Sequence, residues 1–335
     1  SKRSSSSKKS VPKDNIRTQE PNIIVAGIGG GGNNTVNRIA TKGIKKVDMA
    51  AINTDKTHLK GVNADKKITI GERITQGKGT GGAPKIGKRA AENSAEKFRS
   101  LFRGADLVFL SCGLGGGTGT GGAPVAARIA KEEGAVVTGV ATMPFEVEKR
   151  KEKAKKGLKK LREHADSVII IDNNKISDMA SGLPMRYAFT MADEVLTRTL
   201  KGITETIMYP SLMNLDFGDV KAIMEEGNLI LVGTGEAKGE NRAEKSLKQA
   251  LSCPLLGDID YSTAEGVLMH LSGADVTIKE TEKINNNKVK TIYNPIDFEM
   301  LEMKITKNEM KNLDIKSKKY ILSVSSLYRW DRFWT

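Results

Sequence analysis

The sequence CGLGGGTGTGG, at residues 112–122, decides how the fold of this chain is interpreted. It follows an apolar run, Leu107–Leu110, that predicts a buried strand, and it precedes a segment, Ala123–Ala130, that predicts the start of a helix. Glycines at such a junction cost chain entropy, but they let backbone N–H groups and a helix N-terminus approach an anion closely. The stretch therefore predicts a phosphate-binding loop, to which the hydroxyl groups of Thr118 and Thr120 can contribute.

Two further glycine-rich segments accompany this one. We call Gly27–Asn34 the first glycine loop, Gly113–Gly122 the second and Gly77–Pro84 the third. The first ends a predicted strand, and the third leads into a predicted helix. No G-x-x-x-x-G-K-[ST] motif occurs, so backbone amides must do much of what the lysine of a P-loop does elsewhere. Three such loops at one edge of a sheet predict a site for a polyphosphate.

The first glycine loop also has a second interpretation. Gly27, Gly29 and Gly32 satisfy G-x-G-x-x-G, and Asp55 ends a predicted strand roughly 20 residues later, which is typical of a Rossmann dinucleotide site. That interpretation predicts an NAD-dependent oxidoreductase. The pyrophosphate of a dinucleotide needs only one glycine loop, however, so the two additional loops favour the polyphosphate.

Composition narrows the class of protein. The chain has 335 residues, 38% of them hydrophobic and 28% charged, which is typical of a globular protein with room for two domains. No apolar run approaches the roughly 18 residues of a transmembrane helix, and the polar N-terminus lacks the apolar core of a secretory signal. Cys112 and Cys253 have no metal-binding spacing, and His58, His164 and His270 are scattered. We therefore expect a cytoplasmic protein with no membrane span, no disulfide and no metal held by its own side chains, its histidines being structural or on the surface.

The net charge of +14 raises the question of a nucleic-acid partner. The basic residues gather in the N-terminal tail and in a run at residues 149–156, whereas aromatic residues make up 5% of the chain and do not interleave with them. Without stacking platforms we expect no nucleic-acid partner. The second run has helical spacing and is best interpreted as a solvated helix face, with weak attraction to anionic surfaces left open.

Strand and helix patterns alternate along the first half of the chain. Strands are expected at Asn22–Ile28, Asp48–Asn53, Lys67–Ile70, Asp106–Ser111, Ala135–Thr142 and Ser167–Ile171. Helices are expected at Asn34–Lys42, Pro84–Phe102, Ala123–Glu133 and Lys149–His164. This alternation predicts an α/β fold with a mostly parallel sheet covered on both faces, whose ligand lies outside the carboxyl ends of the strands.

The second half begins with a long helical pattern, Pro184–Met208, which has apolar residues on more than one face and predicts a buried connecting helix. A second strand system follows, with a strand at Asn228–Gly233, a helix near Arg242–Leu251 and a strand near Val267–Leu271. From about Ile284 the chain is rich in Asn, Lys and Ile, and strand patterning is weak.

The glycine loops carry a resemblance to a known family. Residues 115–121, GGGTGTG, resemble the signature of the tubulin/FtsZ GTPase family, in the form of its prokaryotic, archaeal-type FtsZ branch. The resemblance continues through Ala51–Asp55, Pro144–Phe145 and Asn214–Val220, and it covers about residues 22–280. It implies a GTPase domain with a mostly parallel sheet, a long central helix and a second, smaller α/β domain.

The resemblance also implies which residues hold GTP or GDP. The α- and β-phosphates would be bound by Gly29, Gly30, Gly31, Gly32, Asn33, Gly115, Gly116, Gly117, Thr118 and Gly119. The γ-phosphate would be approached by Thr80 and Gly81, next to Ala83, where family members usually have Asn. The ribose would be contacted by Glu148 and Arg150, in a loop that is shorter here than in the family.

The same resemblance assigns the guanine base to Asn173, Phe189 and Asp193. Phe189 would stack near the base, and the carboxylate of Asp193 would accept hydrogen bonds from N1 and N2 of guanine, because an ionised carboxylate only accepts. Without the resemblance, Asn173 would be interpreted as a capped turn and Phe189 as a core aromatic.

A last motif, Asn214-x-Asp216-x-x-Asp219, lies beyond the long helix. From the residues alone, Asp216 is a plausible helix N-cap and Asp219 suits the first helical turn electrostatically. The resemblance implies that this loop is catalytic: it enters the nucleotide pocket of the next subunit, where the two acids position and polarise the attacking water. Mg²⁺ on the β- and γ-phosphates is implied with it.

These expectations divide the chain into five parts. They are a disordered basic tail at 1–20, a GTP-binding domain at 21–183, a central helix at 184–209, a second domain with the activating loop at 210–283, and a divergent C-terminal segment at 284–335. The implied function is a self-assembling GTPase that forms head-to-tail filaments at the division site in mid-cell. Its partners would be further copies of itself and membrane-tethering division proteins. The alternatives are the NAD-dependent oxidoreductase and a non-polymerising GTP-binding regulator.

Overall fold

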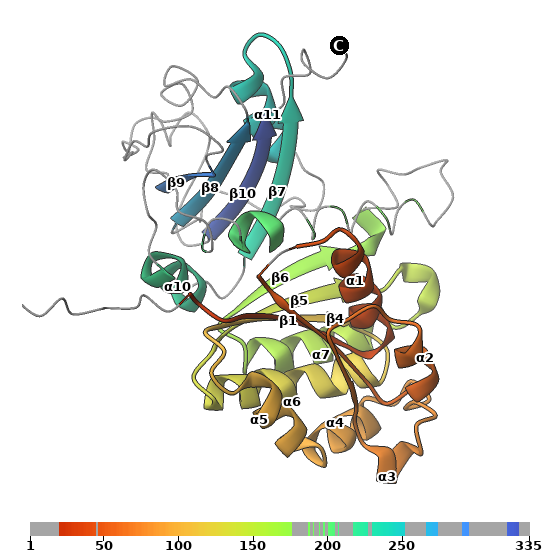
Figure 1. Ribbon diagram of the computed structural model, residues 1–335. Helices are drawn as coiled ribbons and strands as arrows, with labels where there is room; N and C mark the ends of the chain where they lie inside the picture. Colours follow the sequence, from red (N-terminus) through yellow and green to blue (C-terminus); the bar gives the residue numbers. More distant parts are fainter. Residues whose placement is uncertain are drawn as a thin grey trace, which may run out of the picture.

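The structure is a computed structural model. It describes residues 20–44, 46–175, 217–226 and 230–251, the positions 187, 190, 194, 197, 200–204 and 207, and three further strands (Figure 1). The predicted disordered tail up to residue 19, together with Cys253, Phe189, Asp193, Asn214 and Asp216, lies outside the described residues.

Parallel strands form the centre of the molecule. The strands are β1 (Ile23–Ile28), β2 (Asp48–Asn53), β3 (Lys66–Thr69), β4 (Leu107–Gly113), β5 (Val136–Met143), β6 (Ser167–Asp172), β7 (Ile230–Ala237), β8 (Gly266–Gly273), β9 (Lys290–Asn294) and β10 (Tyr320–Leu327). The first six form a parallel sheet in the order β3-β2-β1-β4-β5-β6. The mostly parallel α/β sheet expected from the sequence is thereby confirmed.

Helices connect these strands and cover both faces of the sheet. They are α1 (Gly29–Thr41), α2 (Lys56–Lys60), α3 (Glu72–Thr75), α4 (Pro84–Glu92), α5 (Ala95–Phe102), α6 (Thr118–Glu132), the 3₁₀ turn η1 (Glu146–Glu148), α7 (Lys151–Arg162), α10 (Phe217–Glu226) and α11 (Arg242–Leu251). Every described position between 187 and 207 is helical, as the long helical pattern predicted.

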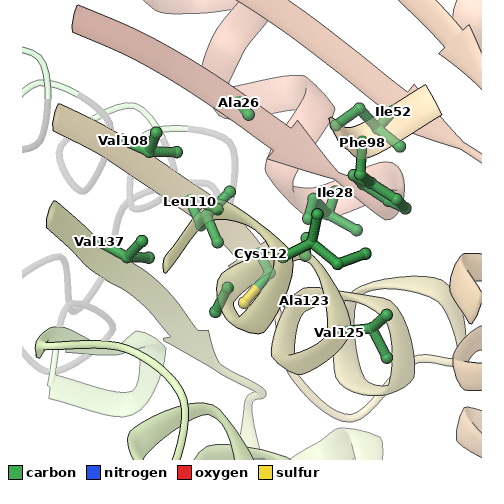
Figure 2. Packing of buried hydrophobic residues seen from close by; sticks show 14 of the residues in the cluster. Ala26, Ile28, Ile52, Phe98, Val108, Leu110, Cys112, Ala123, Val125 and Val137 are labelled. Carbon is green, nitrogen blue, oxygen red and sulfur yellow. The ribbon is translucent and has the colours of Figure 1, made fainter. Parts of the chain in front are cut away.

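Strand side chains alternate between two apolar cores. Ile24 and Ala26 of β1 and Val108 and Leu110 of β4 belong to the core under α5, α6 and α7, which also contains Phe98 (Figure 2). The intervening residues of both strands face the other core, which they share with α1, α10 and the helix around residue 200. Because both faces are covered, β1 and β4 are apolar along most of their length, and the glycine loops remain at one uncovered edge.

The thiol of Cys112 belongs to the first of these cores (Figure 2). Its side chain is 1% exposed, and burial in apolar surroundings raises the pKa of the thiol to about 12, because the thiolate would lose its hydration. The cysteine at the start of the second glycine loop is therefore a packing residue, and it stays a neutral thiol at physiological pH.

Two predicted helices begin earlier than expected. We expected helices at Asn34–Lys42 and Ala123–Glu133, but α1 begins at Gly29 and α6 at Thr118. Glycine has a poor intrinsic helix propensity, which is why the sequence pattern starts later. Tertiary packing overrides that propensity here, so part of each glycine loop is the first turn of a helix.

The helix predicted at Pro84–Phe102 is wrong in one respect, because it is two helices. The break lies at Ser94, whose backbone leaves the helical region with φ −115° and ψ 21°. The Oγ of Ser94 accepts a hydrogen bond from the Gly71 N–H at 2.9 Å, so a buried tertiary contact replaces helix continuation. The second helix then packs Phe98 and Phe102 into the core.

Four strands form the second part of the sheet order, β7-β10-β8-β9. The expectation of weak strand patterning after Ile284 is corrected here, because β9 and β10 both come from that segment. β10 pairs in parallel with β7 on one side and with β8 on the other over eight residues. A single pair, Ile169↔Ile230, joins this group to β6.

The position of β10 between β7 and β8 can be tested with proline substitutions. Proline at Val324 would remove an N–H donor from a strand paired on both sides, whereas proline at Ile292 would affect β9, which pairs only with β8. We expect Val324→Pro to abolish the hydrogen-exchange protection of β7 and β8, and Ile292→Pro to lower it much less. Equal effects of the two prolines would contradict the interior position of β10.

Candidate nucleotide-binding site

Two helices begin at the carboxyl ends of neighbouring strands. α1 starts directly after β1, and α6 starts within the second glycine loop, which follows β4. Neither N-cap makes a side-chain hydrogen bond, and neither first turn contains an acidic residue. The backbone N–H groups of both first turns and the positive ends of both helix dipoles are thus available to an anion at one edge of the sheet.

The first and second glycine loops approach each other at backbone distance. A Cβ on Gly29 would lie 2.8 Å from the backbone N of Gly119, and one on Gly32 would overlap the carbonyl O of Ser111. A Cβ on Gly31 would lie 3.0 Å from the Cα of Gly113. No side chain fits at these contacts, so these glycines serve packing: they hold the two helix N-termini together.

Other glycines of the site face open space. A Cβ on Gly116 would meet nothing within 4 Å, and the same is true of Gly81. A Cβ on Gly30 would meet only the Nε2 of His58, at 3.9 Å. These three positions present bare backbone on the uncovered side of the loops, which is the space that a closely bound phosphate needs.

The third glycine loop packs against the second. A Cβ on Gly117 would overlap the Oγ1 of Thr80 and lie 2.8 Å from the backbone N of Ala83. The hydroxyl of Thr118 is 2.7 Å from that of Thr54 and 3.5 Å from that of Thr80, and all three side chains are buried. This threonine cluster joins the second and third glycine loops to the loop after β2.

Thr120 has a different task from the one expected. Its side chain is 3% exposed, and its Oγ1 accepts a hydrogen bond from the Gly115 N–H at 2.9 Å. The hydroxyl therefore closes the turn of the second glycine loop, and the expectation that it lies against the ligand is corrected.

Asn33 lies at the inner end of the first glycine loop. Its Oδ1 accepts a hydrogen bond from the Ile52 N–H at 3.1 Å, which joins α1 to β2. Its Nδ2 is buried and has no hydrogen-bond partner among the described residues. A buried donor without a partner calls for a ligand or water that completes it, so this atom fits the predicted contact with a bound phosphate.

Glu148 and Arg150 lie beside the second glycine loop. The Cβ of Arg150 would be 3.0 Å from a Cβ on Gly115, and an Arg150 Nη1 is 3.7 Å from Glu148 Oε2. Glu148 also accepts a hydrogen bond from the Phe145 N–H at 3.0 Å. Both side chains thus border the phosphate loops, where the resemblance assigns the ribose.

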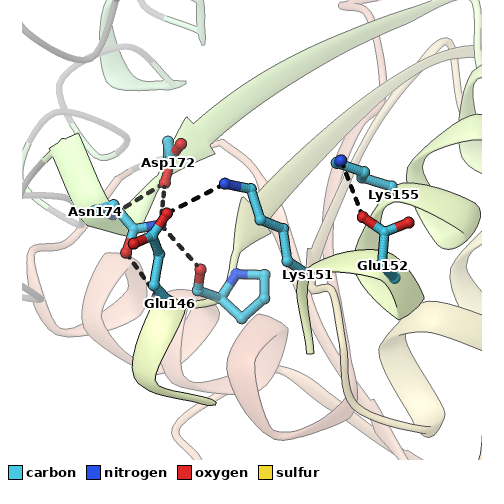
Figure 3. A network of polar contacts seen from close by, with 7 residues as sticks. Glu146, Lys151, Glu152, Lys155, Asp172 and Asn174 are labelled. Atoms are coloured by element: carbon cyan, nitrogen blue, oxygen red, sulfur yellow. Dashed lines mark hydrogen bonds and ion pairs between the residues drawn. The ribbon is translucent and has the colours of Figure 1, made fainter. Parts of the chain in front are cut away.

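Asn173 is 7% exposed and directly follows β6. Its neighbour Asn174, which sequence reasoning missed, connects the loops after β5 and β6 (Figure 3). Asn174 Oδ1 accepts from the Glu146 N–H at 2.8 Å, while its Nδ2 donates to Pro144 O at 3.3 Å and to Asp172 Oδ1 at 2.9 Å. The only signal in the sequence is the pair of asparagines after a strand. Asn174 holds the backbone on which Asn173 is presented.

Two residues near the first glycine loop, His58 and Asp55, make contacts that bear on their sequence interpretation. His58, expected to be structural or on the surface, places Nε2 near Gly30 and Nδ1 3.5 Å from the Nδ2 of Asn53. Asp55 caps α2, because its Oδ1 accepts from the N–H groups of Thr57 and His58. A carboxylate engaged in a helix cap is not the free ribose acceptor that a Rossmann site requires.

The motif Asn214-x-Asp216-x-x-Asp219, to which the resemblance assigns catalysis, is described only in part. Asp219 is the third residue of α10, and its side chain is not described. α10 packs against β5, where Met224 Sδ lies 3.7 Å from the hydroxyl of Thr138. Within the described ranges no three His, Cys, Asp or Glu side chains gather as a metal site, and no described helix is long and apolar enough to cross a membrane.

This fold and this site define a nucleotide-binding α/β protein in which backbone amides, without a P-loop lysine, are available to phosphates. The chain matches two family models: the GTPase domain of the tubulin/FtsZ family over residues 22–181, and the C-terminal domain of the FtsZ family over residues 228–300. The chain belongs to the tubulin/FtsZ family, and its first domain is a GTPase domain. The comparisons give no support to the oxidoreductase, which is withdrawn.

Within the family the similar proteins are archaeal FtsZ. Cell division protein FtsZ 2 of Methanocaldococcus jannaschii is 49% identical over 278 residues, which are 82% of this chain and 73% of that protein. Cell division protein FtsZ 2 of Haloferax volcanii is 47% identical over 80% of this chain and 67% of its own length. Among solved structures, an FtsZ dimer of M. jannaschii superposes with a TM-score of 0.77 at 41% identity, covering 86% of each chain.

The two kinds of glycine can be separated by mutation. A Cβ on Gly121 would overlap the Pro84 carbonyl oxygen between α6 and α4, whereas Gly116 has open space and no left-handed backbone. We expect Gly121→Ala to lower the free energy of unfolding by about 1–3 kcal/mol. Gly116→Ala should leave it unchanged and weaken GTP binding by roughly tenfold or more, because a methyl group then occupies the phosphate's space.

Thermal unfolding and a GTP titration of both variants check this expectation. Loss of stability in Gly116→Ala, or normal GTP affinity in that variant, would contradict the division of the glycines into a packing set and a ligand set.

Proposed function

We propose that this chain is a GTPase that assembles head to tail into cell-division filaments and hydrolyses GTP between neighbouring subunits. The observation that carries the proposal is the distance, along the sheet, between α10 and the glycine loops. α10 contacts Thr138, near the start of β5, whereas the nucleotide site lies beyond the carboxyl ends of the strands. The five residue steps from Thr138 to Met143 already span about 17 Å of strand. Figure 1 shows α10 beside the beginning of β1.

Two described acids near the phosphate loops, Asp55 and Glu148, already make other contacts. Asp55 caps α2, and Glu148 accepts a backbone hydrogen bond and pairs with Arg150. A water that attacks the γ-phosphate needs a further group to orient it. Asp219 belongs to α10, which contacts the opposite end of the sheet, so the motif Asn214-x-Asp216-x-x-Asp219 would supply that group to another subunit.

Such an arrangement requires a head-to-tail contact between two copies of the chain. If the α10 end of one subunit covers the glycine loops of the next, the interface is heterologous and does not close, so it generates a filament. Each active site is then completed by assembly. The relatives named as cell-division proteins, and the FtsZ dimer of M. jannaschii, support this proposal for the present chain.

The residues present fit GTP together with Mg²⁺. The α- and β-phosphates face the N-termini of α1 and α6, and the γ-phosphate faces Thr80 and Gly81. The ribose lies at Glu148 and Arg150, and the base at Asn173, Phe189 and Asp193. Mg²⁺ bound to the phosphate oxygens would neutralise charge on the β- and γ-phosphates. Since no protein cluster for a metal occurs among the described residues, the phosphates and water would be its principal ligands.

We place the protein in the cytoplasm at the division site, where its filaments would form a mid-cell ring. This placement rests on the cell-division relatives. Because no described helix is long and apolar enough to cross a membrane, we propose that membrane-tethering division proteins are its further partners. A non-polymerising GTP-binding regulator would show no GTP-dependent light scattering.

Base selectivity tests the guanine assignment. Asp193→Ala removes the carboxylate that accepts from guanine N1 and N2, and we expect GTP affinity to fall by about 10- to 150-fold, which is the cost of roughly 1.5–3 kcal/mol for a charge-assisted hydrogen bond. ATP binding, weak in the native chain, should not change. Equal affinities of the native chain for ATP and GTP would overturn the assignment.

Shared catalysis is tested by Asp219→Ala. The variant should bind GTP and sediment as filaments, because its own pocket is intact, but its GTP hydrolysis should fall sharply and its filaments should persist longer. Hydrolysis by the native chain should rise steeply with protein concentration and vanish on dilution. Full hydrolysis by Asp219→Ala, or rates per subunit that do not depend on concentration, would contradict the shared site.

A mixing experiment tests whether the pocket and the activating loop of one active site come from different subunits. Gly116→Arg fills the phosphate space but keeps a sound activating loop, whereas Asp219→Ala keeps a sound pocket. We expect the mixture to recover hydrolysis that neither variant has alone, because one of the mixed interfaces combines both sound parts. Sedimentation must first show that Gly116→Arg enters filaments.

A further inference from the structure

One face of α7 lies against the second glycine loop. Arg150 borders Gly115, and a Cβ on Gly157 would overlap the Cγ2 of Thr120. Lys153 lies between them in the sequence, three residues after Arg150 and four before Gly157. Residues at this spacing share one face of a helix, so Lys153 belongs to the face that meets the nucleotide site.

Lys153 reaches the third glycine loop. Its Nζ donates a hydrogen bond to the carbonyl oxygen of Gly82 at 3.0 Å, across 71 residues of sequence. Gly81 and Gly82 have left-handed φ values of 59° and 76°, and a Cβ on either would meet nothing within 4 Å. The loop at this point has no side chains of its own, and the lysine supplies a contact that fixes its carbonyl group.

The other side of the same loop is fixed by backbone contacts. The Ala83 N–H bonds to Thr80 O at 3.2 Å, the Gly79 N–H bonds to Thr54 O at 3.2 Å, and Gly117 lies directly against Thr80 and Ala83. The turn at Gly81 and Gly82 is therefore held between the second glycine loop on one side and Lys153 on the other.

We propose that Lys153 is a positioning residue that holds the third glycine loop open to the terminal phosphate of GTP, and that its charge favours GTP over GDP. This inference rests on the proposed function, in which this loop faces the γ-phosphate. A lysine ammonium has three N–H donors, and one is used by Gly82. Its positive charge lies beside the loop that the γ-phosphate would contact, and GDP has no group at that position. Lys153 would thus supply part of what the absent P-loop lysine supplies elsewhere.

The test compares two lysines of the same helix. Lys153→Met removes the contact, whereas Lys155→Met removes the charge of another exposed lysine, which pairs with Glu152. The affinities of the full chain for GDP and for a non-hydrolysable GTP analogue are measured, together with hydrogen exchange of the nucleotide-free protein. The exchange readout does not depend on bound nucleotide or on hydrolysis.

We expect Lys153→Met to lower the affinity for the GTP analogue by about three- to tenfold, as for a partly exposed charged contact. The affinity for GDP should change less than twofold. The Gly79 and Ala83 amides should exchange faster. Lys155→Met should change none of these values, and Lys153→Arg should restore most of the preference for the GTP analogue.

The role of Lys153 would be overturned if Lys153→Met lowered the affinities for GDP and the GTP analogue equally, or lowered neither. The same loss of affinity in Lys155→Met would also overturn it. If the native chain binds both guanine nucleotides as proposed, those results leave the proposed function standing. A native chain that binds neither nucleotide would overturn the function and the inference together.

Discussion

The backbone contact between the first and second glycine loops is the constraint on which the site depends. β1 and β4 are adjacent and parallel, so the helices that follow them begin side by side only if their first turns can nearly touch. They can because the residues at the contact, Gly29 and Gly119, have no side chains, and because Gly32 lets α1 pack directly on Ser111 of β4. Two sets of unpaired N–H groups and two helix dipoles are thereby focused on one small volume. A polyphosphate stabilises that arrangement, and no carboxylate in either first turn competes with it.

The remaining parts of the site are attached to this pair of loops. Gly117 packs against the third glycine loop, and Gly115 packs against Arg150 at the start of α7. The hydroxyl of Thr118 contacts that of Thr54 after β2. Loops after separate strands are thus fixed relative to one another by short contacts and not by a single binding segment. Nucleotide binding and the packing of the first domain are consequently linked, because the same glycine-rich segments serve both.

Separation of the phosphate site from α10 gives the molecule two unlike ends. The carboxyl end of the sheet carries donors for phosphate, and Met224 of α10, the helix that includes Asp219, contacts Thr138 near the amino end of β5. Under the proposed function, a molecule of this kind would have a complete active site only where unlike ends meet. Assembly and hydrolysis then become one process, and a filament is the natural product of the geometry.

Much of this could be predicted from local sequence. Alternating strands and helices gave the parallel sheet to within a few residues at most boundaries, because apolar runs and helical spacing are local properties. The glycine-rich motifs indicated a phosphate site and the family, since close backbone approach to an anion needs glycine in any fold. What failed was any judgement that depended on distant neighbours, such as the start of α1 at Gly29, the break at Ser94 and the strands β9 and β10.

Tertiary structure alone decided which task each residue has. The sequence presents Gly116 and Gly121 as equivalent members of one motif, but only the packing of α4 on α6 makes Gly121 a contact and leaves Gly116 open. It likewise turns the hydroxyl of Thr120 inward and brings Asn174 and Lys153 to loops far from them in the chain. A residue's type limits the contacts that it can make, but the contacts it does make are set by segments that the fold brings beside it, and that information is not local in the sequence.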